Sequence, residues 1–202
     1  MTFAACAGHA GVSTARDGNY RFEVRLDDRI VGEHTFDVRT RNGVQTVRSD
    51  ARFEVKFLLL TAYRYVHTNR ERWRDGCLES LDSTTEDNGD KSFVKAARTA
   101  PGVLNVSSGN EERVEAGCIG SFAYWNLPFL KQNRRLLNAQ TGAVVDGALR
   151  ILPVDDGPPD VPPETTRYAL SAGQDDITLW YGPQGDWLRL SARLESGRVL
   201  TY

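Results

Sequence analysis

The residues best suited to chemistry lie on one alternating stretch of the chain, from residue 63 to residue 73. Aromatic and polar side chains occupy every second position: Tyr63, Tyr65, His67, Asn69, Glu71 and Trp73. A period of two is typical of a β-strand, whose successive side chains point to opposite faces. An imidazole, an amide and a carboxylate among aromatic rings are typical of the wall of a ligand-binding cavity. The opposite face carries a basic stripe that suits water.

Burying these polar groups has a cost that constrains their surroundings. An amide or imidazole without a hydrogen-bond partner costs about 1–3 kcal/mol, and a lone carboxylate costs more. Inward neighbours on one strand are ~7 Å apart. We therefore expect their partners to come from across the cavity, where a ligand would sit. The competing interpretation is a polar layer that fixes strand register and binds nothing.

Two further aromatic residues, Tyr124 and Trp125, lie in the stretch 121–137, which lacks alternation. We predict one or two short helices near 121–137, with Ser121 as an N-cap and Pro128 opening a second turn. These helices would plug or cover the sheet, and the two rings would line the same cavity. Packing in the hydrophobic core is the alternative role for such rings.

Hydrolase chemistry is the weaker interpretation. A Ser–His–acid set would need His34 or His67 with a serine such as Ser121. The segment that ends at this serine, GCIGS, does not fit the G-x-S-x-G pattern of a nucleophile elbow. The acid pairs Asp155–Asp156 and Asp175–Asp176 match no calcium-loop spacing. We therefore predict no catalytic residue, no metal site and no cofactor.

The elements that must position these residues are strands. Strand-like patterns occur at 20–27, 30–39, 47–57, 63–73, 77–86, 91–98, 103–106, 113–115, 143–152, 165–171, 177–181, 187–194 and 198–202. Turn signals separate them, above all Asn42-Gly43 and Asn88-Gly89, which tolerate positive φ. Alternation breaks at 58–61, which predicts a bulge or bend. We predict a mainly all-β fold, an antiparallel meander that forms a β-barrel or a curved half-barrel.

Length and charge narrow the classes of protein. The chain has 202 residues and a formal net charge of −2, which suits one domain over 20–202 and argues against a nucleic-acid-binding protein. No apolar run approaches the roughly 20 residues of a membrane-spanning helix. Residues 1–19 are expected to be a residual signal or a disordered tail. Within them, 3–6 resembles a lipoprotein processing box, which would place a lipid anchor at Cys6. The alternative is 12–15, which resembles a small-residue cleavage site and would give a mature protein without that anchor.

The chain has three cysteines, and Cys6 belongs to this tail. Cys77 and Cys118 remain as a pair in the folded part. An isolated pair in an exported protein is more often a disulfide than two free thiols. We therefore predict a Cys77–Cys118 disulfide.

Several motifs together resemble an uncharacterised family of exported proteobacterial envelope proteins. The motifs are FEVKFLLLTAYRYVHTN-x3-WRDGCLESL, T-x-DNG, GC-x2-SFAYWN, RLLN-x-QTG and DITLWYGPQGDWLRL. The resemblance covers about 20–202 and implies export to the periplasm or cell envelope and one β-rich domain. It implies no activity, because the family is a domain of unknown function. The departure is at the N-terminus, where members usually begin with a full signal peptide.

These observations favour a carrier or sensor that binds a small apolar or amphipathic, lipid-like ligand inside the barrel. A structural or protein-interaction module with a filled interior is the alternative, and a hydrolase is a more remote one. The interior separates the first two: a cavity of several hundred Å³ favours binding, and a packed interior favours the module.

Overall fold

The computed structural model describes residues 16–57, 60–132, 134–153, 158 and 161–202. Its strands form one 15-stranded sheet in the order β8-β7-β6-β5-β4-β3-β2-β1-β15-β14-β13-β12-β11-β10-β9. Neighbouring strands are antiparallel except β9 and β10, which are parallel. The expectations for residues 1–15, including the lipid anchor at Cys6, fall outside the described residues.

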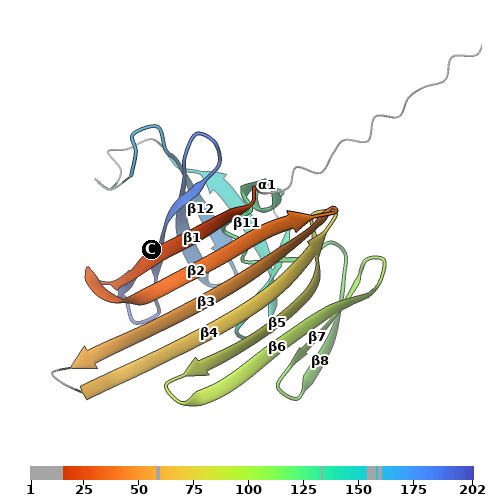
Figure 1. Ribbon diagram of the computed structural model, residues 1–202, viewed down its shortest axis with the longest axis horizontal. Helices are drawn as coiled ribbons and strands as arrows, with labels where there is room; N and C mark the ends of the chain where they lie inside the picture. The colour runs from red at the N-terminus through yellow and green to blue at the C-terminus, as the bar shows by residue number, and fades with distance from the viewer. Residues whose placement is uncertain (1–15, 58–59, 133, 154–157, 159–160) are drawn as a thin grey trace, which may run out of the picture.

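The first eight strands form a long curved layer (Figure 1). They are β1 (Gly18–Leu26), β2 (Arg29–Arg41), β3 (Val44–Phe57), β4 (Leu60–Arg74), β5 (Cys77–Asp87), β6 (Asp90–Ala100), β7 (Val103–Ser108) and β8 (Glu111–Ala116). The residues at the predicted hairpin turns have the left-handed φ values that a two-residue turn requires, 50° and 74° at Asn42 and Gly43. The alternation and the turn chemistry thus predicted this layer correctly, and β1 begins two residues earlier than expected.

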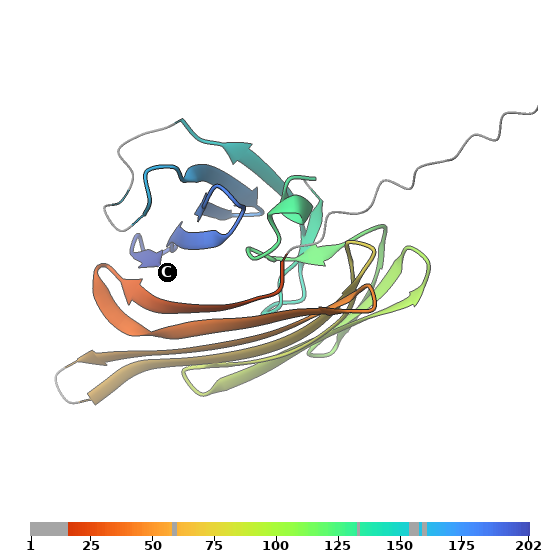
Figure 2. The same ribbon diagram turned by 45° about the horizontal axis from the view of Figure 1, so that its top comes forward.

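The remaining elements form a second, smaller layer over one face of the first (Figure 2). They are β9 (Gly120–Ser121), α1 (Leu127–Leu130), β10 (Arg135–Leu137), β11 (Val144–Ile151), β12 (Thr166–Ala172), β13 (Asp175–Tyr181), β14 (Trp187–Arg193) and β15 (Val199–Thr201). The layers join where β1 pairs with β15. The Asp27 carboxylate reinforces this joint by accepting hydrogen bonds from Nε of Arg198 (2.7 Å) and the backbone N–H of Val199 (2.8 Å).

The sheet does not close into a barrel, so the barrel prediction was wrong and the curved, open alternative describes the fold. Closure would require the two end strands, β8 and β9, to pair. Instead, the segment after β8 turns to β5, where the backbone N–H of Leu78 donates to the carbonyl of Ile119 (2.8 Å). The edge of β8 therefore has no strand beside it among the described residues.

The helical prediction for 121–137 holds only for one turn. The N-cap is Asn126, whose side chain accepts a hydrogen bond from the backbone N–H of Phe129, and Pro128 lies in the first turn. Ser121 belongs to β9 instead of capping a helix. Tight turns occupy 121–126, because Ala123 and Tyr124 each donate a backbone hydrogen bond two residues back. The dense aromatic rings indicated burial and were mistaken for helix.

The hydrophobic core lies between the two layers, and Trp73 occupies its centre with only 2% of its surface exposed. Its ring packs edge-on against Trp125 and Phe129, with centroids 5.4 and 5.1 Å away. Gly120 makes this packing possible, since a Cβ there would lie 2.2 Å from the ring of Phe129. The expected break at 58–61 is only partly described: the register of β3 and β4 shifts between Val55 and Lys56, and 58–59 lie outside the described residues.

Candidate ligand-binding cavity

A cavity of about 780 Å³ lies between the long strands of the first layer and the last strands of the second. Its wall comes from β2, β3 and β4 on one side and from β13, β14 and β15 on the other, and the segments 121–125 and 138–140 line it as well. Most of the predicted binding residues line it: Tyr63, Tyr65, His67, Asn69, Glu71, Tyr124 and Trp125. Trp73 does not, because it is part of the packed core. The basic stripe of β4 lies on the outer, exposed face.

The carboxyl group of Glu71 is a buried polar group of the cavity wall. One oxygen accepts a hydrogen bond from Nδ2 of Asn69 and the other from the indole N–H of Trp73, both at 2.7 Å. The Ser121 hydroxyl is a further donor. Burial raises the pKa of Glu71, and the three hydrogen bonds only partly oppose that rise.

These contacts correct the expectation that partners come from across the cavity. Asn69 and Trp73 lie on the same strand as Glu71, two residues to either side. The spacing of ~7 Å between residues i and i+2 of a strand separates short side chains that point straight away from the sheet. A glutamate side chain is long enough to lean along the strand and reach its neighbours. A register shift of β4 against β5 between Arg72 and Trp73 also alters the direction of the indole.

The side-chain amide of Asn69 has a hydrogen-bond partner for only one of its two polar atoms. Its Nδ2 is bound to Glu71, whereas its Oδ1 is buried and has no hydrogen-bond partner among the described residues. Only 7% of the Asn69 surface is exposed, and the residue lines the cavity. Buried amide groups are nearly always paired, so an unpaired half-amide in a cavity wall indicates a place for a further polar group.

Two histidines line the cavity in neutral form. Nδ1 of His67 lies 2.9 Å from the hydroxyl of Thr85, and burial lowers the pKa of His67 to about 4. Nε2 of His34 lies 2.7 Å from the hydroxyl of Ser49, and Nδ1 lies 3.1 Å from the phenol of Tyr202. Burial, with a smaller contribution from His67, lowers the pKa of His34 to about 3. Both imidazoles are therefore uncharged at neutral pH.

The contact between Ser49 and His34 gives little support to hydrolase chemistry. A general base needs a pKa near the working pH, and the pKa of His34 is about 3. Its second ring nitrogen faces the Tyr202 phenol, whereas a triad would place a carboxylate there. Ser121, the serine considered from the sequence, lies beside Glu71. Ser49, His34 and Tyr202 therefore form a hydrogen-bonded chain and not a Ser–His–acid set.

Aromatic rings form the apolar part of the wall. The rings of Phe53 and Tyr65 stack with centroids 5.2 Å apart and planes 10° apart, and the imidazole of His67 continues the stack at 6.3 Å. Burial raises the pKa of Tyr65, so this phenol is neutral as well. The cavity therefore combines a flat aromatic surface with a hydrogen-bonding end around Asn69.

Three polar residues of the cavity wall that were not predicted from the sequence as binding residues are His34, Ser49 and Tyr202. His34 occupies an inward position of β2. Ser49 occupies an inward position of β3, between the buried residues Val47 and Ala51. A polar residue at an inward position was therefore the available signal. Tyr202 had no comparable signal, because it meets His34 from 168 residues away.

Comparison with known proteins places the chain in a family. The family profile described as Domain of unknown function (DUF6134) matches residues 22–202. The chain belongs to this family. No curated protein and no solved structure matches it. The profile therefore spans nearly the entire sheet of this DUF6134 protein, and it assigns no activity to the cavity.

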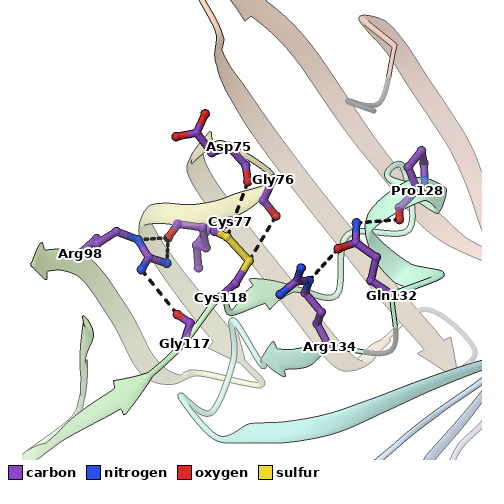
Figure 3. The surroundings of a disulfide bond; sticks show 10 residues. Asp75, Gly76, Cys77, Arg98, Gly117, Cys118, Pro128, Gln132 and Arg134 are labelled. Atoms are coloured by element: carbon purple, nitrogen blue, oxygen red, sulfur yellow. Dashed lines mark hydrogen bonds between the residues drawn. A yellow bond between two sulfur atoms is a disulfide. The ribbon is translucent and has the colours of Figure 1, made fainter. Parts of the chain in front are cut away.

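A disulfide joins Cys77 to Cys118, as predicted from the sequence, with the Cα atoms 5.2 Å apart (Figure 3). It links the start of β5 to the segment that leads into β9, and thus to Ser121 in the cavity wall. The guanidinium of Arg98 supports the same junction by donating to the carbonyl of Leu78 at 2.9 Å. A disulfide of this kind indicates an oxidising compartment for this member of the family.

In the part of the chain that the structure describes, no helix combines the length and the apolar character needed to cross a membrane. Among the same residues, no cluster of three or more His, Cys, Asp or Glu side chains has an arrangement that would hold a metal ion. Asp175 and Asp176 lie at the rim of the cavity, and Asp155–Asp156 is outside the described residues.

Proposed function

We propose that the protein is an exported carrier or sensor that binds a small amphipathic molecule in the cavity between its two layers. The observation that carries the proposal is the cavity itself. Its volume of about 780 Å³ lies within the roughly 300–1,000 Å³ typical of small-molecule sites. Flat aromatic rings suit the apolar part of such a ligand, and the half-paired amide of Asn69 suits its polar part.

Two other observations support the proposal over its alternatives. A structural module with a filled interior has no need for an unpaired amide beside an open volume. The Cys77–Cys118 disulfide agrees with a function outside the cytoplasm, and we propose the periplasm or cell envelope.

The first test is native mass spectrometry of the protein purified from its own envelope, where we expect a mass increment that organic extraction removes. The second is titration with the uncharged fluorophore N-phenylnaphthylamine, where we expect saturable binding. A protein that carries no co-purifying molecule and shows no saturable binding contradicts the proposal.

A cavity-filling variant locates the binding. Ala192 lines the cavity, so Ala192→Trp should abolish fluorophore binding. Ala148 is exposed on β11 and outside the cavity, so Ala148→Trp is the matched control and should bind as the wild type does. Thermal unfolding of both variants verifies that they fold. Equal binding by a folded Ala192→Trp variant also contradicts the proposal.

A further inference from the structure

The charges of the cavity wall are unfavourable for an anion. Four acidic residues line it, one near the inner end and three at the rim: Glu71, Asp175, Asp176 and Glu195. Among the described residues of the wall, Arg193 is the one cation, because His34 and His67 are neutral. Arg193 is exposed and its Nη1 donates to the carbonyl of Gly197 (2.9 Å). A carboxylate or phosphate that reached the inner end beside Asn69 would lose its hydration without gaining a cationic partner there, because Arg193 lies at the exposed rim.

The inner end is also a poor site for a cation. Glu71 is the one acid there, and its oxygens already accept hydrogen bonds from Asn69 and Trp73, with a further donor in the Ser121 hydroxyl. Only 5% of the Glu71 surface is exposed. An ammonium group would therefore have to displace these donors to reach the carboxyl group.

The unpaired half of the Asn69 amide defines the required partner. If Glu71 is ionised, Nδ2 of Asn69 faces it and the unpaired Oδ1 needs a donor. If Glu71 is protonated, the amide turns, Oδ1 faces the carboxyl group and the unpaired NH2 needs an acceptor. A hydroxyl group both donates and accepts, so it satisfies Asn69 in either state.

We infer that the cavity selects an uncharged amphiphile with a hydroxyl-bearing head group, held with its head at Asn69 and its apolar chain against Phe53 and Tyr65. Fatty alcohols and monoacylglycerols have this chemistry, and fatty acids and phospholipids do not. This inference rests on the proposed function, and it adds the class of ligand.

The test is displacement of N-phenylnaphthylamine from the delipidated full chain by four ligands that share one alkyl chain. Lauryl alcohol and monolaurin should bind at least about tenfold more tightly than laurate or laurylamine, because a charged head group would be desolvated beside Asn69 without an ionic partner. Equal or tighter binding of laurate or laurylamine overturns the inference and leaves the proposed function standing. Absence of both a co-purifying molecule and saturable fluorophore binding overturns the proposed function and this inference together.

Two variants test the two halves of the argument. Asn69→Leu should weaken monolaurin about tenfold relative to the affinity of the same variant for the fluorophore. Glu195→Lys, an exposed change at the rim, should strengthen laurate binding relative to monolaurin binding, whereas the exposed Glu164→Lys away from the cavity should alter neither affinity. If Asn69→Leu does not fold, the Glu195→Lys result decides. Laurate affinity that is unchanged in Glu195→Lys refutes the charge argument.

Discussion

Removing the disulfide should lower stability by an amount that follows from the chain length it encloses. Cys77 and Cys118 are 41 residues apart in sequence. When the bond is lost, the chain-entropy relation adds about 13 cal/mol/K to the entropy of unfolding for a loop of this length. This corresponds to a loss of about 4 kcal/mol of stability at room temperature. For a domain of this size the melting temperature should fall by roughly 8–16 °C. The folded geometry should persist, since Leu78 still pairs with Ile119 and Arg98 still holds Leu78.

The assay is thermal unfolding of the wild type and of the double variant Cys77→Ala/Cys118→Ala, each with and without reductant. Cys6 is replaced by serine in both, so that no other thiol contributes. The reduced wild type should melt with the double variant, and reductant should not affect the variant. Equal stability of all four samples, or complete alkylation of both cysteines in the unfolded, unreduced wild type, would refute the assignment of the bond.

Two further predictions concern the buried polar and packed groups. His34 and His67 are neutral in the native state, with pKa values lowered by burial to about 3 and about 4, and they regain the ordinary 6.5 on unfolding. The unfolded state therefore binds more protons below pH 6.5, so stability falls as the pH drops, by about 2 kcal/mol per histidine at about pH 5. His67→Gln should remove about half of that loss in urea unfolding, and an unchanged pH slope would contradict it. Gly120→Ala should cost about 1–3 kcal/mol or more through its clash with Phe129, while Gly182→Ala, whose nearest contact would be 3.5 Å, should be neutral.

The long first layer was predictable because its determinants are local. A strand with one buried face repeats every two residues, and Asn-Gly or Asp-Gly turns need no distant contact to adopt positive φ. The cavity-lining face of β4 followed from the same alternation, since Tyr65, His67 and Asn69 must share a side of the strand. The stretch 121–137 was less predictable, because its aromatic rings report burial and burial does not specify a helix.

Local sequence patterns predicted the strands apart from β9 and β10, which lie in or beside the stretch expected to be helical. They also predicted the hairpin turns, the inward face of β4 and the pairing of Cys77 with Cys118. The tertiary structure alone places the second layer back over the first and leaves the sheet open, because this depends on the joint of β1 with β15 and on the turn of the segment near Ile119 toward β5. The tertiary structure also decided how the cavity is completed. His34 meets Tyr202 across 168 residues of chain, and no local pattern specifies which residues meet at such a separation. Conversely, Glu71 finds its partners on its own strand, at Asn69 and Trp73. The length of the glutamate side chain and a bulge in β4 bring these neighbours together, and an alternating pattern reveals neither.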